Sequence, residues 1–143
     1  MPIEKHNRLD MAKRQLETAL GLYFDGTDLY STITLAGAAD EIFGQVLRAS
    51  GKEPRLEEIA KSVAAIHKKL YGDELAPKTV AERANHARNA LKHWSSNQPI
   101  EVTFDLIEEA KDMLERGIAN YWALYGDLSD PMERFEREVL HAA

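Results

Sequence analysis

The stretch from Leu29 to Ala49, LYSTITLAGAADEIFGQVLRA, decides the fold of this chain. Its apolar residues recur at helical spacing and cover much of the circumference of a helix, and the alternation typical of strands is hard to find anywhere in the sequence. A helix that is apolar on most of its sides is buried among other elements. We therefore expect residues 29–49 to form the central helix of an all-α protein.

The same periodicity predicts further helices on both sides of this segment. They cover residues 8–24, 56–70, 77–91 and 103–125, with a short last helix that starts near Ser129. Breaks rich in Gly, Pro, Ser and Asn separate them near residues 25–28, 50–54, 72–77 and 95–99. The chain is therefore predicted to be an up-and-down helical bundle of four longer helices with short connecting and terminal helices.

Length and composition indicate a single domain that covers residues 1–143. Apolar residues make up 44% and charged residues 29% of the chain, which is typical of a folded globule with one hydrophobic core. Cysteine is absent, which excludes disulfides, thiolate metal ligands and cysteine nucleophiles. No apolar run approaches the ~20 residues of a membrane span, and no signal peptide follows Met1. We therefore expect a cytoplasmic protein that does not enter a membrane.

The formal net charge of −6 argues against a protein that coats nucleic acid through non-specific phosphate attraction. It does not exclude an enzyme with one local basic site. Such a site is predicted between residues 78 and 93, where Glu82 is the one acidic residue. The cations and histidines that gather there are Lys78, Arg83, His86, Arg88, Lys92 and His93.

One face of the predicted helix 77–91 carries groups suited to proton transfer. At about 100° per residue, four residues fall opposite the core face of this helix, namely Glu82, His86, Asn89 and His93. The core face holds Val80, Ala84, Ala87, Leu91 and Trp94. Two imidazoles, an amide and a carboxylate therefore lie within reach of one another, although an ordinary solvated polar face is the alternative interpretation.

Arg88 lies between these two faces. Five residues leave its side chain about 140° from that of His93 on an unbroken helix. The two side chains converge within one chain only if the helix loosens near Lys92. Otherwise they converge across a dimer, in which each chain contributes one edge of the site.

The segment Arg88-Asn89-Ala90-Leu91-Lys92-His93 resembles the signature of the HEPN family. That signature is an Arg followed, after four to six residues, by a His, and the Arg often has an Asn directly after it. The segment also lies in the second half of a helical bundle, before a break and a last long helix, as in the family. Residues 35–42, in which four small residues precede an acidic pair, resemble the family's second helix. The similar spacing from Arg134 to His141 lacks the adjacent Asn and the following break, and we interpret it as accidental.

The resemblance implies a homodimer that cleaves RNA without a metal or another cofactor, as a toxin or an RNA-processing factor controlled by an antitoxin or another regulatory protein. It implies a composite site at the dimer interface and products with a 2′,3′-cyclic phosphate. Arg88 would stabilise phosphate charge and His93 would act as general acid or base. The supporting residues would be Asn89, which orients the phosphate or the partner, His86, Lys92, Arg83 and Asp40.

Asp40 falls among apolar residues on the wheel of the helix 29–49. A buried carboxylate needs a partner, and Arg88 is the candidate; the alternative is an exposed position at the edge of the bundle. Glu138 and His141 have the spacing of ferritin-like di-iron ligands, but such centres need two of these motifs. The chain has one, and no metal site is predicted.

A competing interpretation is a non-catalytic helical module that binds a nucleotide or a partner protein through the same surface. The acidic net charge favours this module. The intact Arg-Asn-x-x-x-His motif favours the enzyme.

Overall fold

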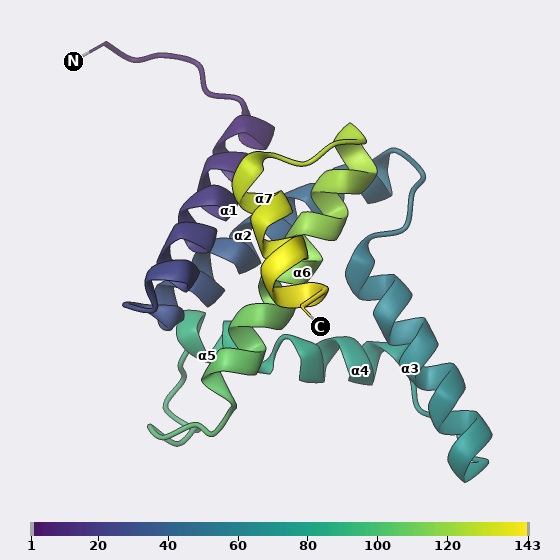
Figure 1. Ribbon diagram of the computed structural model, residues 1–143. Helices are drawn as coiled ribbons and strands as arrows, with labels where there is room; N and C mark the ends of the chain where they lie inside the picture. The colour runs from purple at the N-terminus through teal and green to yellow at the C-terminus, as the bar shows by residue number, and fades with distance from the viewer. Residues whose placement is uncertain (1, 143) are drawn as a thin grey trace.

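The computed structural model describes residues 2–142, which form seven α-helices and one π-helical turn (Figure 1). The elements are α1 (Arg8–Asp25), α2 (Leu29–Ala49), α3 (Arg55–Tyr71), α4 (Pro77–Ala84), α5 (His86–Lys92), α6 (Leu106–Tyr125), α7 (Asp130–Phe135) and the π-helical turn η1 (Glu136–Leu140). No strand occurs in this part of the chain, so the all-α prediction is confirmed. No helix within residues 2–142 is long and apolar enough to cross a membrane.

Helix α2 is the central element, and its bounds are those expected from the sequence. It begins after Asp28, whose side chain accepts a hydrogen bond from the backbone N–H of Ser31 at 3.0 Å and so caps the helix. It packs against α1 on one side and α6 on another, which buries residues around most of its circumference. The apolar surface predicted around most of this helix is therefore explained by its contacts with two flanking helices.

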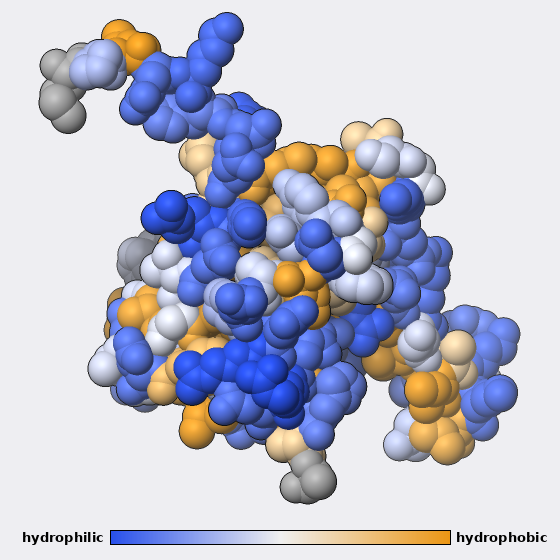
Figure 2. Space-filling model, turned by 45° about the horizontal axis from the view of Figure 1, so that its top comes forward, coloured by the Kyte–Doolittle hydropathy of each residue, from blue (hydrophilic) through white to orange (hydrophobic). Residues whose placement is uncertain are grey.

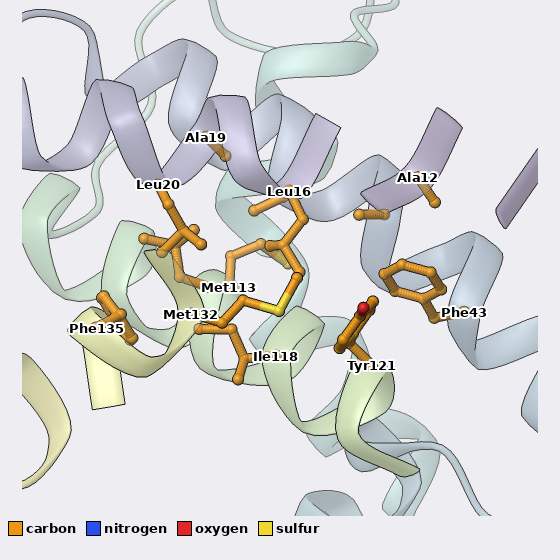
Figure 3. Close-up of a cluster of buried hydrophobic side chains, with 13 residues drawn as sticks. Ala12, Leu16, Ala19, Leu20, Phe43, Met113, Ile118, Tyr121, Met132 and Phe135 are labelled. Atoms are coloured by element: carbon orange, nitrogen blue, oxygen red, sulfur yellow. The ribbon is translucent and has the colours of Figure 1, made fainter. Parts of the chain in front are cut away.

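The hydrophobic core lies where α1, α2 and α6 meet, and α7 closes one end of it (Figure 3). Its largest fully buried apolar side chains include Leu16, Leu20, Phe43, Met113, Leu114, Ile118, Met132 and Phe135. The rings of Tyr23 and Phe24 meet the ring of Phe135 edge to face, with centroids 5.5 and 6.5 Å apart. These aromatic contacts hold the C-terminal segment against α1.

A polar network crosses this interior between α2 and α6. The Asp40 carboxylate accepts hydrogen bonds from Arg116 Nη2 at 2.7 Å and from Asn120 Nδ2 at 3.0 Å. The Asn120 Oδ1 atom in turn accepts one from the backbone N–H of Arg55 at 2.8 Å. Asp40, Arg116 and Asn120 are at most 5% exposed. Asp40 is therefore buried, and the expectation that Arg88 is its partner was wrong: Arg116, across the α2–α6 contact, takes that place.

The expected helix 77–91 is divided into α4 and α5 at Asn85, whose backbone leaves the helical conformation at φ −99° and ψ 6°. The guanidinium of Arg116 donates to the backbone oxygen of Ala84 at 3.4 Å. In a continuous helix that oxygen would accept from the N–H of residue 88. The two pieces also pack on different helices, α4 on α3 and α5 on α2.

Helix α3 leaves the body of the bundle, and its C-terminal end projects at the lower right of Figure 1. Val63, Ile66 and Leu70 lie on one face of this end and are 40%, 57% and 69% exposed. Figure 2 shows the resulting hydrophobic surface on the projecting lobe. The apolar periodicity of the sequence thus gives a helix here, but within the described chain this face has little to pack against.

Removal of the Asp40 carboxylate should destabilise the fold strongly. In Asp40→Ala the Arg116 guanidinium keeps its charge in the interior without its hydrogen-bonded counter-ion, which costs about 3–5 kcal/mol. Urea denaturation followed by circular dichroism measures the loss. The adjacent Glu41→Ala is the control, because the Glu41 side chain is 48% exposed and pairs only loosely. Its expected effect is within about 0.5 kcal/mol, and similar losses in both variants would contradict a structural role for the network.

Candidate functional site

The candidate residues lie on α5 and at its C-terminal end. The helix is anchored by Ala87, which is fully buried, while His86 and Asn89 are exposed. It ends at Lys92, and His93 follows in an extended conformation with φ −134° and ψ 141°. The His93 N–H donates to the backbone oxygen of Asn89 at 2.8 Å. The helix therefore ends at Lys92, which was the condition for Arg88 and His93 to converge within one chain.

His86, Asn89 and His93 line one cleft, called here the imidazole cleft, with a volume of about 540 Å³. Its other wall is the loop that connects α5 to α6. That wall contributes Gln98, Pro99, Ile100, Glu101 and Val102, and Trp94 lies between the two walls. The polar face predicted from the helical wheel is thus a concave surface, because the loop folds back beside α5.

Arg88 lies on a different side of α5, against α2. A Cβ atom placed on Gly37 would lie 2.7 Å from Arg88 Cδ and 2.9 Å from Cγ, so the arginine stem occupies the space that the missing side chain leaves. The Arg88 side chain is 16% exposed, and its Nη1 atom lies 3.9 Å from Glu41 Oε2. Its Nε atom is buried and has no hydrogen-bond partner within the described residues.

Arg88 and His93 consequently do not share a depression within one protomer. Arg88 lines a smaller hollow between α5 and α2, which it shares with Asp40, Glu41, Arg48, Asn85 and Asn120. Asn89 connects the two sites, since it lines the imidazole cleft and its Oδ1 accepts a long hydrogen bond of 3.4 Å from Arg88 Nη2. Arg88 and His93 therefore stay apart although the helix ends at Lys92.

The remaining candidates surround these two depressions without entering the imidazole cleft. Lys92 is exposed and its Nζ lies 3.7 Å from Glu41 Oε2. Arg83 lies on α4, beside His86 in a shallow hollow that Thr79 and Glu82 also line. Asp40 borders the Arg88 hollow, but its carboxylate is bound to Arg116 and Asn120.

Two carboxylates from other helices reach this region, and the local sequence did not reveal them. Glu41 of α2 faces Arg88 and Lys92. Burial raises the pKa of Glu109 on α6, and the negative charge of Asp112 adds to the rise. Positive charge on His86 and Arg116 acts in the opposite direction and lowers the pKa of Glu109. The basic cluster seen in the sequence is therefore partly neutralised in the fold.

The second Arg…His spacing does not form a site. Arg134 pairs with Glu138 at 2.5 Å and lies over the ring of Phe24, 3.7 Å from its centroid. His141 pairs separately with Glu136 at 3.0 Å. Within residues 2–142 no three His, Asp or Glu side chains are grouped so that they could hold a metal ion.

Trp94 is the residue of this site that the sequence misplaced. The helical wheel assigned it to the core, but its side chain is 59% exposed beside His93. The wheel does not apply to Trp94 because α5 ends at Lys92. The break at residues 95–99 was the available signal, since a helix that frays before a break can release its last residues.

No family model, no curated protein and no solved structure matches the chain. The resemblance to HEPN domains therefore rests on residues 88–93 and on the order of the helices.

Gly37 should be coupled energetically to Arg88, since Gly37→Ala forces the arginine stem to move. We expect a coupling of about 0.5–3 kcal/mol in a double-mutant cycle of Gly37→Ala and Arg88→Ala, measured by urea denaturation. Gly44→Ala is the control on the same helix, because the added methyl meets Pro54 Cβ at 3.5 Å, an ordinary contact. If the two substitutions change the free energy of unfolding additively, the Arg88 side chain can move to another conformation without cost.

Proposed function

We propose that this chain is a HEPN-type, metal-independent endoribonuclease that acts as a toxin or an RNA-processing factor. The observation that carries the proposal is the arrangement at the end of α5. His86, Asn89 and His93 line one open cleft, and Arg88 reaches Asn89 from the adjoining side. These are the residue types that phosphodiester cleavage without a metal requires, and they are gathered on one short helix and the residue that follows it.

The chemistry would proceed by attack of the ribose 2′-oxygen on the adjacent phosphorus. One imidazole removes the 2′-OH proton as the P–O2′ bond forms. A second imidazole protonates the 5′-oxygen as the P–O5′ bond breaks, which leaves a 2′,3′-cyclic phosphate and a 5′-hydroxyl. Histidine suits both proton transfers because its reference pKa is near neutrality. Arginine keeps its charge and holds two phosphate oxygens in a fork.

The separation of Arg88 from the imidazole cleft supports a site completed by a second copy of the chain. In one protomer the guanidinium lies at the α2 side of α5, so it does not face a phosphate held by His86 and His93. A twofold dimer with His93 near its axis brings the arginine of one protomer toward the histidine of the other. We therefore propose a homodimer with composite sites, and control by an antitoxin or another regulatory protein.

A non-catalytic module that binds a nucleotide or a protein is the second candidate function. The position of Glu41 favours it, because this carboxylate lies within 4 Å of both Arg88 and Lys92 and competes with a phosphate for them. For such a module the cleft binds its ligand without turnover.

The first test is cleavage of single-stranded RNA by purified protein in the presence of EDTA. His93→Ala should lower the rate by about 10²–10⁴-fold, which is the usual contribution of a positioned acid or base. Arg88→Lys should also be damaging, because lysine lacks the planar fork. The control is His141→Ala, an exposed histidine far along the chain, which should leave the rate unchanged. Melting temperatures close to that of wild type exclude loss of folding as the cause.

Cleavage that survives His93→Ala, or no cleavage above background, would favour the binding module over the enzyme.

The composite site has its own test, the mixing of two inactive variants. When Arg88→Ala and His93→Ala protomers form a mixed dimer, one of its two composite sites keeps both residues. Activity should return to about a quarter of the wild-type value after statistical exchange of subunits. Light scattering must show a dimer at the concentration used. If the protein is a monomer, or if the mixture is as inactive as its components, the proposed composite site is contradicted. Either the whole site then lies in one chain, or the chain has no such site.

A further inference from the structure

Trp94 presents a large flat surface to the imidazole cleft. It directly follows His93, lines the cleft, and is 59% exposed. An indole in that position leaves apolar area in contact with water, which is unfavourable unless something covers it. Its neighbours in the cleft wall, Pro99 and Ile100, are also apolar, and Ile100 is 82% exposed.

The orientation of this indole is fixed by its own loop. Trp94 Nε1 donates a hydrogen bond to the backbone oxygen of Gln98 at 3.2 Å. The N–H of Gln98 donates to the backbone oxygen of Ser95 at 2.9 Å, and the N–H of Ser95 donates to Gln98 Oε1 at 3.0 Å. The polar edge of the ring is thus satisfied within the loop, and the ring offers a π-face to a ligand at little further cost in conformational entropy.

We propose that Trp94 forms a nucleobase subsite, on which an unpaired base of single-stranded nucleic acid stacks beside His93. This inference rests on the proposed function and specifies its substrate. Every base has a π-face that an aromatic side chain can cover, whereas the faces of bases inside a duplex are already stacked. A cleft of about 540 Å³ is within the range that accommodates a ligand of nucleotide size.

The subsite lies where a substrate of the proposed nuclease would need it. His93 and Trp94 line the same cleft, so a base stacked on Trp94 would have its own phosphate within reach of His93. Selection of an unpaired base would also leave the ribose free to take the geometry for in-line attack. The subsite thus selects single strands for the catalytic histidine.

Little preference among the four bases is expected. The backbone oxygen and Oε1 of Gln98 are engaged within the loop, and Asn89 Oδ1 is engaged by Arg88. With these three acceptors in use, fewer groups of the cleft are left to read base edges, whereas the stacking surface of Trp94 accepts any base.

The two tryptophans of the chain give a matched pair of reporters. Trp122 is 56% exposed, nearly as much as Trp94, but it lies on α6 and lines a separate hollow with Arg55 and Glu58. Trp122→Phe leaves Trp94 as the fluorophore, and Trp94→Phe leaves Trp122. The probe is a single-stranded DNA oligonucleotide in EDTA, since it can stack but has no 2′-OH and is not cleaved by the proposed chemistry.

Titration should quench the fluorescence of the Trp122→Phe protein and leave that of the Trp94→Phe protein nearly unchanged. A hairpin duplex of the same base composition should quench much less. Trp94→Ala should weaken binding of the oligonucleotide about tenfold or more, as judged by fluorescence anisotropy of a labelled strand. Equal quenching of the two tryptophans, equal quenching by the duplex, or no quenching at all would overturn the subsite. If the fluorescence of Trp94 changes with protein concentration and not with the oligonucleotide, Trp94 is buried between protomers. That result would also overturn the nucleobase subsite.

The failure of the subsite and the failure of the nuclease remain distinguishable. The oligonucleotide should still quench the fluorescence of Trp94 in the His93→Ala variant, although this variant no longer cleaves RNA. RNA cleavage by a protein whose Trp94 is not quenched contradicts the subsite alone. Quenching of Trp94 without RNA cleavage by the wild-type protein supports the subsite and contradicts the nuclease alone.

Discussion

The ion pair between Asp40 and Arg116 is the constraint on which the arrangement of the helices depends. Two charged groups are costly to remove from water, and here each is hydrogen-bonded to the other and to neutral neighbours. Asn120 binds the same carboxylate and also receives the N–H of Arg55 at the start of α3. Arg116 reaches the last residue of α4 through the Ala84 oxygen. The Asp40 carboxylate thus connects four helices, since Asn120 extends the network to α3 and Arg116 extends it to α4. The candidate site lies directly after the end of α4.

The sequence predicted the elements whose causes are local and missed those whose causes are distant. Helix α2 begins and ends where expected, because its cap at Asp28 and its apolar surface are encoded within the segment itself. The division of α4 from α5 was missed, since Arg116 is 32 residues away from the Ala84 oxygen that it binds. The choice of Arg116 over Arg88 as partner of Asp40 likewise depends on which helices pack together, which periodicity does not specify.

The candidate site divides in the same way. His86 and Asn89 were placed together by the helical wheel, and the structure brings them to one cleft because both lie on α5. His93 lines that cleft although it has left the helix, whereas Trp94, one residue later, could not be placed by a wheel at all. Glu41 was known only as part of an acidic pair on another helix, and its contact with the cations of α5 required the packing of α5 on α2.

These carboxylates bear on how an acidic protein would hold RNA. Phosphate attraction supplies much of the affinity of most nucleic-acid-binding proteins, and it depends on cations that are free to replace counter-ions. Here Glu41 lies beside Arg88 and Lys92, and Glu109 interacts electrostatically with His86, so the positive charge around the cleft is partly compensated before any ligand arrives. A substrate would then have to be held mainly by contacts that do not depend on net charge. The exposed indole of Trp94 is the feature of the cleft that offers such a contact, which is why base stacking and proton transfer are proposed for adjacent residues.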